Sequence, residues 1–352
     1  MKLLITGICG FAGRAITDTL LENMGDLEIT GIDNFSRAGS EMNRKPLEQK
    51  GVKVIVGDIR SIADVNQLPA VDWVIDAAAN PSVLAGIDGK SSSREVVENN
   101  LYGTVNLLEF CKQHRAGFIL LSTSRVYNIE TLCGLRMDDS GDAFTPTEQS
   151  FPSGISSQGV AENTSTQSPV SLYGATKVAS ESLAIDYGRS FDFPVWINRC
   201  GVLAGAGQFG RADQGIFSFW LHAWNARRPL KYIGFNGSGR QVRDCLHPRD
   251  LVPLLTKQFA GNAKAPPIVN LGGGSASNMS LKQLSAWCAD RFGAHEVTAD
   301  LQPRPFDVPW LVMDSGLATQ TWDWQPATPM ANILEEIATH AEAHPDWLDV
   351  VT

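Results

Sequence analysis

The amino-terminal glycine pattern constrains the fold of this chain more than any other feature. An apolar run from Leu3 to Ile5 is followed by Gly7, Gly10 and Gly13, and helical periodicity begins there. Glycines permit a tight turn, close approach of the backbone to a pyrophosphate, and close packing of helix on strand. The N–H groups that open the helix favour an anion. The pattern predicts a strand, a phosphate-binding turn and a helix; the alternative is a packing loop that binds no nucleotide.

Short apolar runs alternate with longer helical segments through the first half of the chain. Strands are predicted at 2–7, 27–33, 53–58, 73–79 and 118–124, and helices at 12–24 and 94–114. Repeated strand, helix, strand order indicates parallel strands joined by right-handed crossovers. Fully apolar strands are expected where helices cover both faces. We therefore expect an α/β fold built on a Rossmann-type, doubly wound parallel sheet.

The second half of the chain is less regular. Residues 137–170 are rich in Ser, Thr, Gly, Gln and Pro, which predicts a long functional loop. From about Gly207 onward, the sequence predicts a smaller, interleaved substrate-binding lobe. We place the dinucleotide-binding domain at 1–206, with a strand returning to its sheet near 240–252, and the lobe mainly at 207–352.

Asp33 bears on which dinucleotide would bind. It lies twenty residues after Gly13, at the end of a predicted strand. A carboxylate there can accept hydrogen bonds from both hydroxyls of the adenosine ribose and repels a 2′-phosphate. This predicts NAD rather than NADP as the cofactor. Arg37 leaves the alternative open, because an arginine at that place could bind the phosphate.

Tyr173 and Lys177 lie four residues apart in the segment SLYGATK. That spacing places both side chains on one face of a helix. A nearby ammonium lowers the pKa of a phenol, so the pair is typical of a tyrosine that moves a proton. The alternative is a surface tyrosine and lysine on an ordinary helix.

These motifs resemble those of the extended short-chain dehydrogenases/reductases, especially the nucleotide-sugar epimerases and dehydratases, over nearly the whole chain. The family has the pattern GxxGxxG and a YxxxK pair, as here. STSRVYN places Thr123 where the family has its Ser or Thr. GDI at Gly57–Ile59 matches the segment near the adenine, DAAA at Asp76–Ala79 matches the strand end that lines the cofactor, and Asn100 matches a helix asparagine.

The resemblance implies roles for these residues. Tyr173, as phenolate, would remove the proton of a sugar hydroxyl while hydride passes to bound NAD. Lys177 would lower the phenol pKa and bind the nicotinamide ribose, and Thr123 would position the reacting oxygen. A keto-sugar would then turn over in the pocket and take the hydride back on its opposite face. With Tyr173 and Lys177, the implied cofactor-binding residues are Gly7, Gly10, Phe11, Ala12, Gly13, Asp33, Asn34, Ser36, Arg37, Asp58, Ile59, Ala77, Ala78, Ala79, Asn100, Ser122 and Cys200.

The implied substrate is a nucleotide-diphosphate sugar. Arg243 and Arg304 match family positions that hold the diphosphate; the alternative is salt bridging, for instance of Arg243 with Asp244. Gln208 and Phe209 either line the pocket or pack a loop. The implied substrate-binding residues are Thr123, Gln208, Phe209, Arg243, Arg304 and Asp307.

Three segments, 207–215, 237–251 and 270–274, are similar to those of one subgroup, the CDP-paratose (CDP-tyvelose) 2-epimerases. This similarity implies inversion at C2 of a CDP-linked dideoxyhexose. Cys200, Gly201 and Val202 replace the Tyr-Phe-Asn of many 4-epimerases, and Ser124 and Arg125 replace the Asp-Glu of the 4,6-dehydratases. Epimerisation at another carbon such as C4, reduction of a keto-sugar, and a non-catalytic NAD-binding regulator remain alternatives.

Composition narrows the class of partner. The chain has 352 residues and a net charge of −9, which argues against bulk binding of nucleic acid or an anionic membrane. Six scattered cysteines indicate free thiols in a reducing cytoplasm, and no apolar run is long enough to span a bilayer. His340 and His344 lack an evident third ligand, so no metal is expected. The family resemblance implies a homodimer or homotetramer.

Overall fold

A parallel sheet of seven strands organises the first half of the protein. The computed structural model describes residues 1–89, 91–147, 150–262 and 264–351. The strand order is β14-β10-β5-β4-β1-β2-β3, and all neighbouring strands run parallel. The strands are β1 (Lys2–Thr6), β2 (Glu28–Asp33), β3 (Lys53–Val56), β4 (Trp73–Asp76), β5 (Gly117–Thr123), β10 (Val195–Cys200) and β14 (Ile268–Leu271).

The register brings the carboxyl ends of these strands to one edge. Thr6 pairs with Ile32 and Asp76, and Cys200 pairs with Thr123. Ligands of doubly wound sheets bind beyond this edge, where the strand order reverses. In this sheet the order reverses between β1 and β4. The strands expected from the sequence and the doubly wound α/β fold are confirmed.

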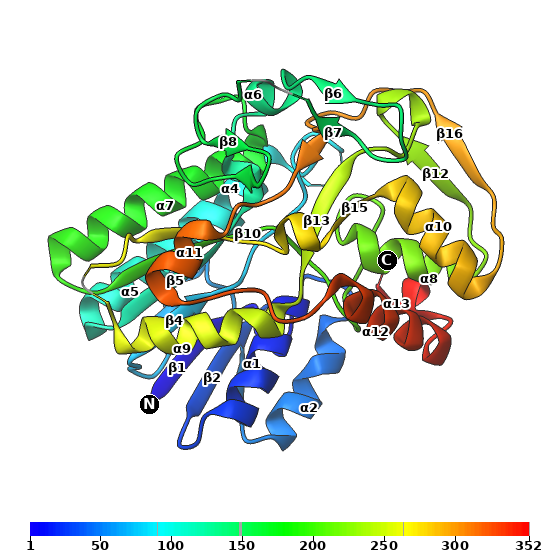
Figure 1. The fold of residues 1–352 in the computed structure, drawn as a ribbon. Coiled ribbons are helices and arrows are strands. Elements are labelled where there is room, and N and C mark those ends of the chain that lie inside the picture. Colours follow the sequence, from blue (N-terminus) through cyan, green and yellow to red (C-terminus); the bar gives the residue numbers. More distant parts are fainter. Residues whose placement is uncertain (90, 148–149, 263, 352) are drawn as a thin grey trace.

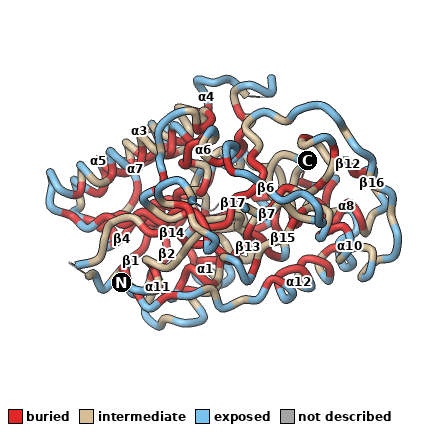
Figure 2. Tube along the Cα trace, turned by 45° about the horizontal axis from the view of Figure 1, so that its top comes forward, coloured by how far each residue is buried: buried red, intermediate tan, exposed pale blue. Residues whose placement is uncertain are grey.

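Helices cover both faces of the sheet (Figure 1). Buried residues of α1 (Phe11–Asn23), α9 (Val252–Ala260) and α11 (Gly316–Trp322) share one hydrophobic cluster with the strands. Buried residues of α5 (Gly103–His114) and α7 (Ser171–Phe191) share another on the opposite face. Figure 2 shows buried segments running through the sheet and on into the second half of the chain. The shorter helices α2 (Arg44–Gln49), α3 (Ile62–Val65) and α4 (Ser93–Val97) complete this half.

The helix predicted at 94–114 is interrupted by a π-helical turn. α4 leads into this turn at Glu98–Tyr102, and α5 follows directly. Asn100 lies within the turn. Its side-chain oxygen accepts a hydrogen bond from the Asn80 backbone N–H at 2.8 Å, and its side-chain NH2 donates to the Asn80 carbonyl oxygen at 3.1 Å. π-turns are frequent at functional sites, and this one fixes a loop at the edge of the sheet.

The second half of the chain builds a lobe around a smaller sheet. Strand β13 (Val242–Leu246) pairs with β11 (Val202–Leu203), β15 (Asn278–Ser280) and β17 (Trp310–Leu311). Around it lie α8 (Ile216–Asn225), α10 (Leu281–Phe292), α12 (Met330–Ala343) and α13 (Trp347–Val351), toward the right in Figure 1. Strands β12 (Leu230–Ile233) and β16 (Val297–Asp300) pair at the outer side.

The strand that returns to the large sheet differs from the one expected. A strand does form near 240–252, but it is β13, the centre of the small sheet. The returning strand is β14, which pairs with β10 from Ile197–Ile268 to Cys200–Leu271. Both β13 and β14 are short, and polar residues interrupt both, so the sequence pattern could not tell which sheet each would join.

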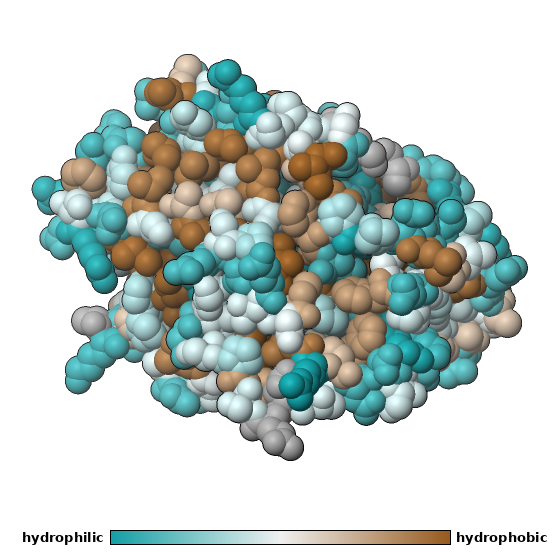
Figure 3. Space-filling model, turned by 90° about the horizontal axis from the view of Figure 1, so that it is seen from above, coloured by the Kyte–Doolittle hydropathy of each residue, from teal (hydrophilic) through white to brown (hydrophobic). Residues whose placement is uncertain are grey.

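The long loop expected at 137–170 contains two small hairpins. They are β6 (Met137–Asp138) with β7 (Thr145–Pro146), and β8 (Ile155–Ser156) with β9 (Gly159–Val160). The short helix α6 (Ile129–Cys133) precedes them. In the described part of the chain, no helix combines the length and apolarity that a membrane crossing requires. Viewed from above, hydrophobic side chains gather on part of the surface among polar ones (Figure 3).

Candidate active site

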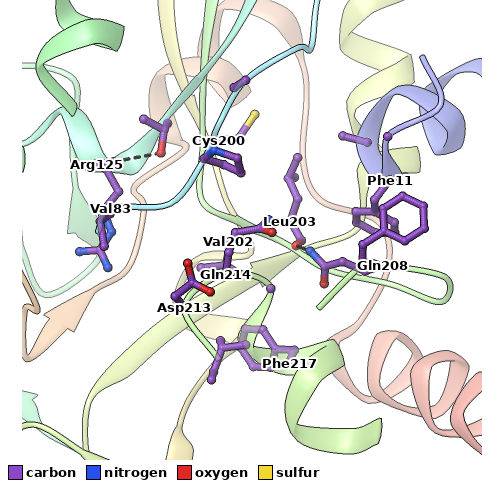
Figure 4. A pocket seen from close by; sticks show the side chains of 18 of the residues that line it. Phe11, Val83, Arg125, Cys200, Val202, Leu203, Gln208, Asp213, Gln214 and Phe217 are labelled. Carbon is purple, nitrogen blue, oxygen red and sulfur yellow. Dashed lines mark hydrogen bonds between the residues drawn. The ribbon is translucent and has the colours of Figure 1, made fainter. Parts of the chain in front are cut away.

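A cleft of about 410 Å³ lies between the carboxyl edge of the large sheet and the lobe. Figure 4 shows its walls: Phe11 and Arg125 lie on opposite sides, with Cys200, Val202 and Asp213 between them. Of the residues expected at the cofactor, the cleft is lined by Gly7, Gly10, Phe11, Ala12, Gly13, Asp33, Asn34, Ser36, Arg37, Ala77, Ala78, Ala79, Ser122, Tyr173 and Cys200. The residues expected at the substrate also line it: Thr123, Gln208, Phe209, Arg243, Arg304 and Asp307.

The glycine turn is built for close packing and leaves a helix N-terminus open. Gly7 has a φ of +59°, and a Cβ on Gly13 would come within 2.3 Å of the Gly7 carbonyl oxygen. Gly10 caps α1 without a side-chain hydrogen bond. The first N–H groups of α1 therefore remain available to an anion, as a dinucleotide pyrophosphate requires.

Asp33 ends β2 beside this turn. Its carboxylate accepts hydrogen bonds from the backbone N–H groups of Cys9 and Phe35, each at 2.9 Å. Burial raises the pKa of Asp33, and these backbone donors oppose the rise. Arg37 extends across to donate to the Phe209 carbonyl oxygen, so its guanidinium already has a partner in the lobe. Burial lowers the pKa of Arg37 to about 10, which leaves the guanidinium charged near neutral pH.

Four residues expected at the cofactor are not among the described residues of the cleft wall: Asp58, Ile59, Asn100 and Lys177. Asp58 pairs with Arg60 at 2.7 Å and accepts from Asn34 at 3.0 Å. Hydrogen bonding to Arg60 lowers the Asp58 pKa to about 2. Asp58 therefore positions Asn34, which does line the cleft.

Asp76 fills the place where the family has a histidine, and the structure gives it a supporting position. The hydroxyls of Thr6 and Thr104 donate to its two oxygens at 2.7 and 2.9 Å. The Thr6 oxygen in turn accepts from the N–H groups of Ala77 and Ala78, at 3.1 and 3.0 Å. This network fixes the strand end that forms one wall of the cleft.

Tyr173 and Thr123 meet at the centre of the cleft. Tyr173 lies in the first turn of α7 and lines the cleft together with Thr123 at the end of β5. Burial raises the phenol pKa to about 12, while the Thr123 side chain and the charge of Arg125 act in the opposite direction. The phenol is therefore protonated at neutral pH unless a further positive charge comes close.

Lys177 follows one turn later and is fully buried. Its Nζ donates to the Leu121 carbonyl oxygen at 3.2 Å, and burial lowers its pKa. Lys177 is not among the described residues that line the cleft. The effect on the phenol pKa that the sequence assigns to Lys177 stays a prediction.

An ion pair that sequence reasoning missed supports the catalytic strands. Glu181, one turn beyond Lys177, binds the Arg199 guanidinium at 2.6 to 3.1 Å. Glu181 also accepts from the Ser122 hydroxyl at 2.5 Å. Because Ser122 precedes Thr123 and Arg199 precedes Cys200, this pair fixes two residues that adjoin the cleft. The signal was an acid four residues after Lys177 on the same helical face.

The lobe contributes positive charge to the substrate side of the cleft. Arg243 does form a salt bridge, as the alternative interpretation expected, but its partner is Asp307 at 2.6 Å and not Asp244. Asp244 is instead buried beneath the backbone N–H groups of Gly274 and Met313, at 3.4 Å each, and burial raises its pKa to about 7. Arg304 reaches the Ala212 carbonyl oxygen at 3.5 Å.

The segment that carries Gln208 and Phe209 joins the lobe to the rim of the sheet. Gln208 donates to the Leu203 carbonyl oxygen at 2.8 Å, while its buried Oε1 has no partner in the described structure. Phe209 stacks on Trp347, with ring centroids 5.8 Å apart. Asp213, which the sequence analysis did not single out, accepts from the Ser82 hydroxyl at 2.7 Å. No local sequence signal marked this cross-cleft contact.

The residues present fit NAD. A glycine cradle that excludes a Cβ, an uncapped helix N-terminus and a carboxylate at the end of β2 lie along one wall. They match the pyrophosphate and the adenosine ribose of a dinucleotide. The Cys200 thiol at the far wall is no candidate nucleophile, because burial raises its pKa to about 12.

Comparison with known proteins extends this correspondence to the whole chain. CDP-paratose 2-epimerase of Salmonella typhi is 29% identical over 340 residues, which cover 93% of this chain and 95% of that protein. A crystal structure of UDP-glucuronic acid 4-epimerase from Bacillus cereus, with UDP-glucuronic acid and NAD, matches 97% of this chain and 99% of its own at 25% identity, with a TM-score of 0.77. UDP-glucose 4-epimerase from Thermotoga maritima, at 20% identity and a TM-score of 0.76 over 97% of this chain and 99% of its own, shares the fold.

The family assignment rests on the extent of the match. The model of the NAD dependent epimerase/dehydratase family covers residues 3–272, which contain the glycine turn, Asp33, Thr123, Tyr173 and the returning strand β14. This chain therefore belongs to the NAD-dependent epimerase/dehydratase family, whose members act on nucleotide sugars.

Proposed function

We propose that the protein inverts carbon 2 of a CDP-linked dideoxyhexose, as a CDP-paratose 2-epimerase does. The observation that carries the proposal is the shared cleft. It brings the dinucleotide cradle, the Thr123–Tyr173 pair and the arginines of the lobe to one cavity. The choice of nucleotide and carbon is supported by the similarity to the Salmonella typhi enzyme along nearly the full length of both chains.

The chain's own residues would move the proton. Bound NAD would supply the hydride acceptor and, once reduced, the hydride donor. Tyr173, already ionised to the phenolate, would take the hydroxyl proton, and this ionisation requires positive charge nearby to overcome the effect of burial. Thr123 would hold the reacting oxygen against Tyr173. After the keto-sugar turns over, the carbon would take hydride on its opposite face while Tyr173 returns the proton to the oxygen, and the configuration at that carbon would be inverted.

The substrate must stay bound while its keto-sugar turns. Arg243 and Arg304 would hold the diphosphate, because a guanidinium matches phosphate oxygens in two-point geometry. Asp307 keeps Arg243 in place through their 2.6 Å contact. The Asp307 Oδ2 is buried without a partner in the described structure, so it can accept a substrate hydroxyl.

Dehydration of the sugar is disfavoured by the residues beside Thr123. The 4,6-dehydratases that the chain resembles carry an acidic pair there, and this chain has Ser124 and Arg125. A guanidinium remains charged and cannot accept the proton that elimination of water requires.

Two measurements test the proposed reaction. Mass spectrometry of small molecules released from purified protein should find NAD, and thermal-shift screening should favour CDP- over UDP-, GDP- and dTDP-sugars. Incubation with CDP-paratose should then invert C2 without added NAD, as followed by NMR. A preference for UDP- or dTDP-sugars would overturn the substrate assignment, and inversion at C4 would overturn the assignment of the carbon. A need for added reductant would indicate a keto-sugar reductase.

We also propose that the protein forms a homodimer or homotetramer. Tyr102, Leu183 and Phe191 expose 60%, 36% and 44% of their surface on the turn before α5 and on α7. Exposed apolar side chains on neighbouring helices favour self-association. Light scattering after size-exclusion chromatography measures the mass directly, and a monomer at micromolar concentration would contradict the proposal.

A further inference from the structure

Arg125 is a partly buried cation beside the catalytic pair. It follows Thr123 by two residues, and its backbone N–H donates to the Thr123 hydroxyl at 3.2 Å, the dashed contact in Figure 4. A Cβ on Gly174 would come within 2.4 Å of the Arg125 carbonyl oxygen, so α7 presses directly against this residue. The backbone of Arg125 is therefore fixed next to both Thr123 and Tyr173.

The described residues give the Arg125 guanidinium few hydrogen-bond acceptors and little negative charge. Its Nη1 donates a long hydrogen bond, 3.4 Å, to the Phe306 carbonyl oxygen. The charges that act on it are those of Arg243, Arg304, Asp307 and the Tyr173 phenolate. Asp307 is already paired with Arg243. The carboxylates that act on these guanidiniums are Asp307 and, at Arg243, also Asp244, so Arg125 has no carboxylate of its own among the described contacts.

An uncompensated charge in a buried site is costly unless a counter-ion arrives. A sugar diphosphate carries two negative charges on its bridging phosphates, and one of them would supply the counter-ion that Arg125 lacks. Arg125 lies across the cleft from Phe11 of the glycine turn (Figure 4). Its charge is therefore placed to bind a phosphate of the substrate. The pyrophosphate of the dinucleotide would lie at the N-terminus of α1, on the other side of the cleft.

The position of Arg125 beside Tyr173 bears on which carbon reacts. In a nucleotide sugar the phosphate is attached at carbon 1, so carbon 2 is the ring carbon bearing a hydroxyl that lies closest to it. Carbon 4 lies across the ring. A phosphate-binding cation in the same wall as the proton acceptor therefore favours chemistry at carbon 2.

We propose that Arg125 binds the sugar-side phosphate of the substrate and thereby holds carbon 2, rather than a more distant carbon, against Thr123 and Tyr173. The inference rests on the proposed function for the identity of the carbon. Arg243 and Arg304, which belong to the lobe, then serve the nucleoside-side phosphate. Arg125 is a positioning residue in this scheme, and it takes no part in proton transfer.

The phosphate contact is tested with nucleotides that differ only in the second phosphate. Calorimetric titration of CDP and CMP into the purified protein should show tighter binding of CDP. Arg125→Gln should reduce the CDP-to-CMP affinity ratio by about tenfold or more, because a charge-assisted contact is lost. The affinity for CMP should stay within about twofold of its original value. Arg125→Lys should restore part of the ratio.

Arg240→Gln serves as the matched control. Arg240 neighbours β13 and lies near Asp139 at 3.8 Å, outside the cleft wall, so the ratio should not change. A ratio that Arg125→Gln leaves intact, or an equal loss of CDP and CMP binding, would overturn the phosphate contact. Thermal unfolding of each variant, compared with the parent protein, separates loss of fold from loss of binding.

The placement of carbon 2 is tested by kinetics. Arg125→Gln should lower kcat with saturating CDP-paratose by about tenfold or more, since the bound sugar is no longer held in register. A rise in KM at unchanged kcat would overturn the placement. If CDP-paratose is not a substrate at all, the proposed function fails, and the comparison of UDP with UMP still decides whether Arg125 binds the sugar-side phosphate.

Discussion

Thr123 at the end of β5 and Tyr173 in the first turn of α7 line the same cleft, and the Thr123 side chain lowers the Tyr173 pKa against the effect of burial. The pair lies 50 residues apart in the chain, and the sheet register brings its two elements together. A sugar hydroxyl placed between these groups would meet a proton acceptor and a second hydrogen-bonding group at once. This arrangement leads to the first prediction.

Tyr173→Phe should lower the rate of epimerisation by about 100- to 10,000-fold, because the ring remains but the proton acceptor is lost. Conversion of CDP-paratose, followed by NMR, measures the effect, and the content of bound NAD should not change. Tyr187→Phe is the control: Tyr187 lies on the same helix and donates to Glu109 at 2.8 Å at the surface. Substantial activity in Tyr173→Phe would contradict the assignment.

Asp33→Asn should shift the cofactor preference. The ribose would lose a charged acceptor, so NAD affinity should fall by about tenfold, while the repulsion of a 2′-phosphate disappears. Calorimetric titration of the cofactor-free protein with NAD and NADP gives the ratio. Asp72→Asn should leave that ratio unchanged, because Asp72 accepts from the Lys2 N–H at the start of β1, away from the cleft wall. An unaltered ratio in Asp33→Asn would show that the carboxylate does not meet the ribose.

Removal of Glu181 should destabilise the fold. Glu181→Gln leaves the Arg199 charge buried without its counter-ion, and the expected cost is about 3–5 kcal/mol. Urea unfolding measures the free energy. The double variant Glu181→Met with Arg199→Met removes both charges and should recover most of the loss. If the double variant were as unstable as the single one, the cause would be packing rather than charge.

Lowering the pH should reduce the free energy of unfolding, because two histidines of the lobe are held neutral in the folded state. The ring nitrogens of His222 and His340 lie 3.0 Å apart, and burial lowers both pKa values to about 4. The unfolded chain takes up these protons near the ordinary value of 6.5. Stability is therefore complete above that pH and falls toward pH 4, by up to about 1.4 kcal/mol per pH unit for each histidine.

Thermal unfolding between pH 7.5 and 5 tests this slope. The double variant His222→Asn with His340→Gln should show a shallower pH dependence than the parent protein. A residual slope is expected from His247, because burial lowers its pKa to about 4 as well. An identical slope in the variant would exclude the pair as its source.

The sequence predicted most of the elements that line the cofactor side. β1, β2 and the start of α1 follow from local patterns, since apolar strands and a glycine turn carry their own signal. The YxxxK spacing likewise predicted that Tyr173 and Lys177 share a helix, as they do in α7. These features depend on residues that are close in the chain.

Contacts between distant segments were harder to predict. The return of β14 rather than β13 to the large sheet depends on packing in three dimensions. The partner of Arg243 was expected next to it and proved to be Asp307, 64 residues later. Asp213 and Ser82 meet across the cleft although 131 residues separate them. Side chains that select a substrate lie on such segments, because the lobe is assembled from several of them.

Two contacts span the cleft: Arg37 with the Phe209 carbonyl oxygen, and Ser82 with Asp213. Both attach the 207–215 segment to the rim of the sheet, on either side of the cavity. A dinucleotide bound along the α1 wall would therefore be expected to leave once these two contacts have broken. The coenzyme should therefore stay bound through many turnovers. Its dissociation rate should be set by how often the 207–215 segment opens.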